Sequence, residues 1–260
     1  MAETESLIQS SRHGDVLHLA LNRPAKRNAA NDALIAALDA QFSAIPADVR
    51  AIVLSGHGEH FCAGLDLSEL SERNVFEGIL HSRGWHAALD RIQYAPVPVV
   101  AVLHGAVVGG GLEIAAACHV RVAENNAFYA FPEGQRGIFV GGGGSVRVPR
   151  LIGAARVADM MLTGRVLDAD EGQATGLSTY LVQPGEGLAK GLALAQKIAA
   201  NAPMSNYAVI QALPRIAELA PEQGLFVESL VAAIAQGEPA AKERLRAFLE
   251  KRAAKVEKPQ

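Results

Sequence analysis

The chain has 260 residues, half of them hydrophobic, and a formal net charge of −3 at pH 7. This is enough apolar material for a large core, whereas the slight negative charge argues against a broad basic face for binding nucleic acid. No apolar stretch reaches the roughly 20 residues of a membrane span, and the polar, acidic start does not resemble a signal peptide. Cys62 and Cys118 have no motif spacing and are interpreted as buried, reduced thiols of a cytoplasmic protein without a metal site.

Apolar runs alternate with a helical pattern in the first part of the chain. The run at 16–21 predicts a strand, and apolar side chains at helical spacing predict a helix over 28–42. Two continuous apolar runs, 51–56 and 97–105, are typical of buried strands. Such strands alternating with helices predict an α/β fold with a largely parallel sheet covered on both faces.

The middle of the chain contains two glutamates that the predicted elements would bring together. A helix is expected to begin near Gly110, followed by a strand at 120–123 and a return strand at 127–131. This arrangement places Glu113, within the helix, near Glu133, which follows the return strand. Two carboxylates at one apolar site can perform paired acid–base chemistry, because one can be protonated while the other is charged. Considered singly, each glutamate is more simply interpreted as an ordinary surface charge.

The pattern changes after about residue 195, where Ala-rich helical stretches follow one another without a strand-like run between them. These stretches are 204–218, 222–235 and 239–254. They predict a division into a core of residues 1–198 and a helical region of residues 199–260. Helices of this composition need an apolar partner surface.

The glycines of 105–114 (GAVVGGGLEI) and 141–144 do not match nucleotide-binding loops. The first segment has no lysine at the P-loop position, and the second does not extend to G-x-G-x-x-G. The sequence also has no G-x-S-x-G elbow, so a serine hydrolase has no support. The HGEH segment at 57–60 lacks the spacing of a zinc helix and is interpreted as an exposed turn.

The same glycines suit an oxyanion hole. The strand of 97–105 leads into glycine-rich backbone and then into the helix that begins near Gly110. Helix N-termini expose unpaired N–H groups, and glycine lets a ligand approach them closely. The loop of 61–67 (FCAGLDL) offers a second backbone donor among small residues. Donors of this kind stabilise a developing negative oxygen, whereas tight helix–strand packing is the alternative explanation of the same glycines.

Six segments form one series along nearly the whole chain. They are LNRPAKRNA (21–29), FCAGLDL (61–67), HGAVVGGGLEIAAACHVRVA (104–123), FPEGQRGIFVGGGG (131–144), LTGRVLDADEGQATGLS (162–178) and AFLEKR (247–252). In order and spacing this series resembles the crotonase (enoyl-CoA hydratase/isomerase) family. The resemblance implies a spiral of ββα units with a C-terminal helical trimerisation region, as a homotrimer or a hexamer of two trimers. It also implies an acyl-CoA thioester substrate, with coenzyme A as part of the substrate and no separate cofactor.

The resemblance further implies roles for individual residues. The backbone N–H groups of Leu65 and Gly110 match the oxyanion-hole pair that holds the thioester carbonyl oxygen. Glu113 and Glu133 match the two glutamates of hydratases. They are expected to act as one catalytic pair, and the resemblance alone does not assign which is acid and which is base.

The resemblance also implies how coenzyme A is bound. Ala63 and Asp66 belong to the loop that meets the adenine, and Lys26 and Arg27 match a basic segment near the phosphates. Either basic side chain could instead be an ordinary exposed charge.

Three parts of the chain depart from the family pattern. Val140 replaces a proline that is often found there, and Gly134-Gln135-Arg136 replaces an apolar triplet after Glu133. Arg136 could lower the pKa of the Glu133 carboxylate or point to solvent. The segment 68–95, which normally shapes the acyl pocket, matches nothing diagnostic. Its Trp85 and His86 are candidate pocket residues, although a core aromatic residue and a solvated histidine are the more ordinary interpretations.

The expected activity is that of an enoyl-CoA hydratase, which adds water across the 2,3 double bond. The alternatives on the same scaffold are double-bond isomerisation, retro-aldol cleavage and hydrolysis. A non-catalytic scaffold or RNA-binding member is a further alternative from another class of protein. The presence of both glutamates favours hydration, because isomerases often keep only one.

Overall fold

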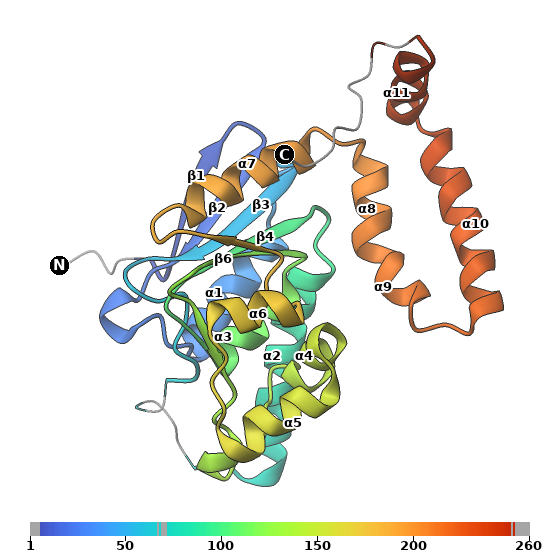
Figure 1. Ribbon diagram of the computed structural model, residues 1–260. Coiled ribbons are helices and arrows are strands. Elements are labelled where there is room, and N and C mark those ends of the chain that lie inside the picture. Colours follow the sequence, from blue (N-terminus) through green and yellow to red (C-terminus); the bar gives the residue numbers. More distant parts are fainter. Residues whose placement is uncertain (1–5, 67, 69–71, 251, 253–260) are drawn as a thin grey trace. The chain divides into compact units, whose positions relative to one another are not determined.

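The computed structural model describes residues 6–66, 68, 72–250 and 252 (Figure 1). The chain forms two compact units, Met1–Ala199 and Ala200–Gln260, and each is described by itself. Among the described residues, no helix is both long and apolar enough to cross a membrane.

Six strands among the described residues of the first unit form one mixed sheet. In spatial order they are β1 (Ile8–His13), β2 (Val16–Leu21), β3 (Ala51–Gly56), β4 (Val99–Leu103), β6 (Val120–Glu124) and β8 (Tyr180–Val182). The β1–β2 pair is antiparallel, and every later pair is parallel. The predicted strands at 16–21 and 51–56 are confirmed, and the run at 97–105 is a shorter strand, β4. The sheet is therefore largely parallel, as expected, with one antiparallel edge that the apolar pattern did not predict.

Successive side chains of the central strands enter two different cores, as the period of a strand requires. In β3, Ile52 and Leu54 join the main core, whereas Ala51 and Val53 face a second core that helix α7 (Gly187–Ala199) covers (Figure 1). Buried side chains of α1 (Asp32–Ser43), α2 (Val75–Gln93) and α3 (Gly110–Ala117) belong to the main core. Helices on both faces explain why these strands are apolar throughout.

A second, two-stranded sheet corrects the prediction for 127–131. The strand β7 (Phe128–Ala130) exists, but it pairs in parallel with β5 (Ala106–Val108) and not with β6. The chain turns at Gly105, which has a φ of +52°. This turn ends β4 early and starts a new strand, and the Phe128 N–H donates to the Gly105 carbonyl oxygen at 2.9 Å. The β5–β7 pair leads directly to the segment that contains Glu133.

The predicted helix over 28–42 begins later than expected, at Asp32. Asn28 is fully buried, and its side chain accepts from the Arg23 N–H and donates to the carbonyl oxygens of His57 and His60. These bonds hold Asn28 at a φ of +53°, outside the helical region. The helix is instead capped by Asn31.

The other described helices of the first unit are η1 (Pro24–Lys26), η3 (Gly134–Arg136), α4 (Gly144–Ile152), α5 (Ala154–Thr163) and α6 (Ala169–Thr175). The second unit contains α8 (Pro203–Gln211), α9 (Leu213–Ile216), α10 (Pro221–Gly237) and α11 (Pro239–Leu249). The predicted helix over 204–218 is thus two helices, because a new helix begins at Leu213 with Pro214 in its first turn. The prediction for 239–254 extends past α11, and residues 251, 253 and 254 lie outside the described residues.

Candidate active site

The backbones of Leu65 and Gly110 lie close together where α3 begins. A Cβ atom built on Gly110, the first residue of α3, would lie 3.9 Å from the backbone nitrogen of Leu65. Within the described chain, neither of these residues has its N–H group bonded to an acceptor in another element. Both residues line one cavity of about 360 Å³. The geometry thus brings together the two donors that the resemblance implies for an oxyanion hole.

Glu113 is held by the tetraglycine segment. It is only 3% exposed, and its Oε1 accepts from the Gly142 N–H at 2.8 Å and the Gly144 N–H at 2.7 Å. Burial raises the pKa of Glu113 above its ordinary value, while the two N–H donors and the charge of Arg147 oppose that rise. The glycines of 141–144, which fit no phosphate loop, therefore serve a carboxylate. Sequence reasoning did not find this partnership.

Glu133 lines the same cavity but differs from Glu113 in its hydrogen bonding. It is 8% exposed, and in the part of the chain that the structure describes, its Oε2 has no hydrogen-bond partner. Burial and, to a smaller extent, the nearby charge of Glu113 raise its pKa to about 7, against the opposing effects of its own backbone N–H group and of Arg136. A Cβ atom on Gly109 would lie 2.6 Å from the Glu133 Oε1, and the φ of +50° at Gly109 also favours glycine beside this carboxyl group.

Trp85 forms one wall of this cavity. Its six-membered ring lies so close to Gly110 and Gly142 that a Cβ atom on either would come within about 3 Å of it. Trp85 is 5% exposed and also belongs to the main core, so it is both a core aromatic and a pocket residue. His86, the other candidate of this segment, does not line the cavity, and its ring lies 3.4 Å from the Ser82 hydroxyl.

The four residues that the resemblance assigns to coenzyme A lie around a second cavity. This cavity of about 320 Å³ is lined by Lys26, Arg27, Ala63 and Asp66. Leu65 and Arg136 line both this cavity and the one with the glutamates, so the two are neighbours. A long substrate can therefore extend from the basic segment to the carboxyl groups.

The Asp66 carboxylate is itself engaged in the protein. It accepts from the Ser68 hydroxyl at 2.6 Å and forms an ion pair with Arg23 at 3.0 Å. The pKa of Asp66 lies below its ordinary value, chiefly because of the hydrogen bond from the Ser68 side chain. Burial opposes this effect, and the hydrogen bond and charge of Arg23 add to it. Asp66 thereby fixes the loop that carries Leu65, and Arg23, in the segment LNRPAKRNA, is a residue that sequence reasoning missed.

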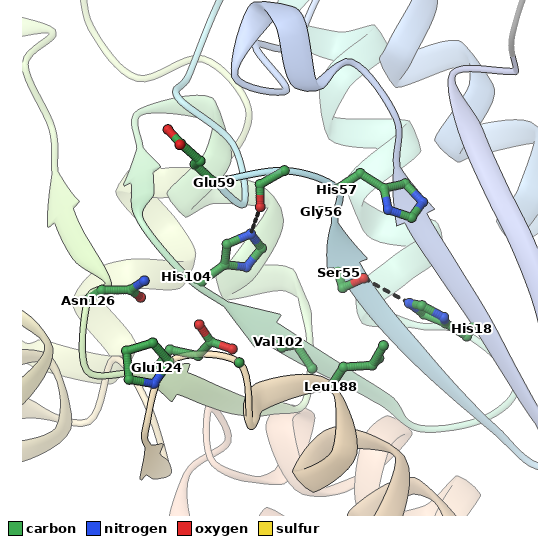
Figure 2. A pocket seen from close by; sticks show the side chains of 13 residues that line it. His18, Ser55, Gly56, His57, Glu59, Val102, His104, Glu124, Asn126 and Leu188 are labelled. Carbon is green, nitrogen blue, oxygen red and sulfur yellow. Dashed lines mark hydrogen bonds between the residues drawn. The ribbon is translucent and has the colours of Figure 1, made fainter.

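The HGEH segment at 57–60 borders a separate, histidine-rich cavity of about 580 Å³ beside α7 (Figure 2). Two histidines of this cavity are bonded within the fold: His18 Nε2 lies 2.8 Å from the Ser55 hydroxyl, and His104 Nε2 lies 3.1 Å from the Gly58 carbonyl oxygen. Neither glutamate of the pair lines it. No group of three His, Cys, Asp or Glu side chains among the described residues is placed to hold a metal ion.

Comparison with known proteins shows which family the chain belongs to. The family model for enoyl-CoA hydratase/isomerase matches residues 11–259. The chain belongs to this family, which is the crotonase family. Its fold, an α/β fold with mixed sheets and C-terminal helices, matches solved crotonase structures, and family membership implies an acyl-CoA substrate.

Individual relatives cover almost the full length of the chain. A short-chain-enoyl-CoA hydratase from Clostridium acetobutylicum is 33% identical over 93% of this chain and 94% of the relative. A 2,3-dehydroadipyl-CoA hydratase from Escherichia coli is 34% identical over 93% of this chain and 95% of the relative. A crystal structure from Rhodopseudomonas palustris, provisionally named an enoyl-CoA hydratase, is 58% identical with a TM-score of 0.93, over 95% of both chains. An enoyl-CoA hydratase structure from Mycobacterium smegmatis is 30% identical with a TM-score of 0.91, over 96% of this chain and 99% of the other.

Proposed function

We propose that the protein is an enoyl-CoA hydratase. The observation that supports this most strongly is a pair of buried carboxyl groups that line one cavity in two different hydrogen-bonding states. Glu113 accepts two backbone N–H groups, whereas Glu133 has an oxygen without a partner in the described chain. Hydration needs one base for water and one acid for carbon, and a pair with unequal environments supplies both.

The environments favour one assignment of the two roles. N–H donors stabilise a charged carboxylate, and Glu113 has two of them. Glu133, whose Oε2 has no hydrogen-bond partner among the described residues and whose pKa is about 7, keeps its proton more readily. Glu113 takes a proton from water, the hydroxide adds to the β-carbon, and Glu133 gives its proton to the α-carbon. The sum of these transfers is one water molecule added across the double bond, and proton exchange with solvent returns Glu113 to its charged form and Glu133 to its protonated form.

The oxyanion hole accounts for the activation of the substrate. When hydroxide adds at the β-carbon, negative charge moves to the thioester oxygen. The N–H groups of Leu65 and Gly110 stabilise this charge in a site shielded by the Trp85 ring. The cavity bordered by Lys26 and Arg27 takes part of the coenzyme A moiety, whose phosphates are anionic.

The alternative functions would need different groups in the same site. An isomerase needs one base that moves a proton between carbons, and a scaffold needs no buried carboxyl pair. Both carboxyl groups are costly to bury, so a protein that uses neither gains nothing from keeping them. Retro-aldol and hydrolytic members share the oxyanion hole and are separated from a hydratase only by their products.

Turnover on a panel of enoyl-CoA thioesters tests the proposal. We expect the purified protein to hydrate short-chain trans-2-enoyl-CoA with kcat of about 1–10³ s⁻¹. The reaction is measured by the loss of absorbance of the conjugated thioester. Long-chain and aromatic enoyl-CoAs in the same panel define the acyl group. Calorimetry is expected to show much tighter binding of the thioesters than of the free acids. No hydration of any member would refute the hydratase, and equal affinity for acids and thioesters would refute the coenzyme A site.

The C-terminal unit supports a homotrimer or a dimer of trimers. Its helix α10 exposes large apolar side chains, among them Phe226 at 65% and Leu230 at 49%, one helical turn apart. Light scattering of the full-length protein at micromolar concentration is expected to give the molar mass of a trimer or hexamer. Replacing both residues by Asp is expected to shift the mass toward the monomer, while the nearby polar exchange Gln223→Asp leaves it unchanged. A monomeric wild-type protein would contradict this assembly.

A further inference from the structure

Arg147 is a buried cation that forms hydrogen bonds in three directions. It belongs to α4 and is 7% exposed. Its Nε donates to the Gln93 Oε1 at 2.6 Å, and its Nη2 donates to the Asp90 Oδ1 at 2.6 Å. Its Nη1 donates to the carbonyl oxygen of Gly142 at 2.9 Å. The planar guanidinium thus connects α2, which carries the two side-chain acceptors, to the glycine segment.

The glycine segment lies between Arg147 and Glu113. Gly142 donates its N–H to the Glu113 carboxylate and accepts from Arg147 through its carbonyl oxygen. Gly143, with a φ of +101°, leaves no room for a Cβ atom, which would collide with the Arg147 Nη1. Gly144 donates the second N–H to Glu113. The backbone of 142–144 therefore forms an arch, with the carboxylate bonded to its N–H groups and the guanidinium bonded to its carbonyl side.

We propose that Arg147 is a positioning residue, which holds the 142–144 arch so that its two N–H groups keep the Glu113 carboxylate charged and aimed at the attacking water. This inference rests on the proposed hydratase function. Asp90 and Gln93 fix the guanidinium from the α2 side, so the arch cannot retreat from Glu113 without breaking these bonds.

The charge of Arg147 acts in the same direction as its hydrogen bonds. It lowers the pKa of Glu113, as do the two arch donors, against the effect of burial. Removing the guanidinium therefore removes the effect of its charge directly and weakens the two hydrogen bonds from Gly142 and Gly144. Each change favours the protonated form of Glu113, which cannot accept a proton from water.

The test compares Arg147→Met, Arg147→Lys and Asp90→Asn with the wild-type protein. Methionine keeps much of the apolar stem without any donor, and we expect kcat for enoyl-CoA hydration to fall by about 10²-fold with KM little changed. The acidic limb of the kcat–pH profile should move to higher pH, because Glu113 then loses its charge at a higher pH. Lysine restores the charge and should recover part of both effects, and Asp90→Asn should give a smaller shift in the same direction. Arg165→Met is the control, since Arg165 is an exposed arginine paired with Asp159 and Glu171.

A second readout does not require turnover. Titration of the glutamate carboxyl groups by carbon-13 NMR, with Glu113→Gln to assign the signal, should show a higher midpoint for Glu113 in Arg147→Met. An unchanged midpoint together with an unchanged acidic limb would overturn the proposal. A fall in kcat and thermal stability without either shift would also overturn it, because Arg147 would then act on folding alone. Absence of hydration by the wild type would refute the proposed function, and the NMR midpoint would still decide the role of Arg147.

Discussion

Replacing Glu113 or Glu133 by Gln is expected to lower enoyl-CoA hydration by about 10²–10⁴-fold, while affinity for the acyl-CoA thioester is retained. Glutamine has the shape of glutamate, and in place of Glu113 its carbonyl oxygen can still accept from Gly142 and Gly144. It cannot exchange a proton with water or with the α-carbon. Because the two groups act as one unit, the double variant should be little worse than the poorer single variant. Steady-state hydration of crotonyl-CoA measures all three.

The pH dependence distinguishes the two glutamates. Glu133 must be protonated to supply a proton, and its pKa is about 7, so kcat/KM should fall as pH rises through this value. This basic limb should be absent from the residual activity of Glu133→Gln.

Glu124→Gln is a matched control for these variants. Glu124 is 8% exposed, as Glu133 is, but it accepts from the Gly187 N–H at 3.1 Å and does not line the glutamate cavity. Its replacement should leave hydration unchanged. Near-wild-type hydration by either Glu113→Gln or Glu133→Gln would exclude the paired mechanism and favour an isomerase with a single base.

Gly111→Ala is expected to cost both stability and activity. A Cβ atom at this position would collide with the Cys62 carbonyl oxygen and lie 2.8 Å from the Cys62 Cβ. That carbonyl accepts from the Val108 N–H at 3.1 Å, so the loop cannot move without straining this bond. Overpacking of this kind costs about 1–3 kcal/mol, and each kcal/mol lowers Tm by about 2–4 °C in a chain of this size.

The loss of activity follows from the same displacement. The loop that carries Cys62 also carries Leu65, so pushing it away from α3 separates the two N–H donors of the oxyanion hole. Loss of one such donor typically costs about 10²–10³-fold in kcat. Gly84→Ala, in the exposed part of α2, is the control, because a Cβ atom there meets nothing within 4 Å. It should keep full activity and raise Tm slightly, since alanine is a better helix former than glycine. Equal Tm and kcat for both variants would show that the loop tolerates the displacement.

Much of the architecture could be predicted from local patterns. Continuous apolar runs identified β3 and β4 because each strand is buried on both faces, and each side chain must be apolar whichever way it points. The prediction of helix boundaries was less accurate where a side chain forms hydrogen bonds to residues far away in the sequence. Asn28 belongs to a helical pattern, yet its bonds to the backbone of His57 and His60 keep it out of α1. No local propensity contains that information.

The sequence by itself determined the fold class, the family and the identities of the two glutamates, because these depend on residue types in a fixed order. Only the tertiary structure decided what distinguishes Glu113 from Glu133. The N–H groups of Gly142 and Gly144, about thirty residues beyond Glu113, stabilise one carboxylate, whereas the other has an unpartnered oxygen in the described chain. The tertiary structure also decided that Arg147 lies behind that glycine arch. A carboxyl group's protonation depends on burial, nearby donors and nearby charges, and these are set by elements that meet only when the chain is folded.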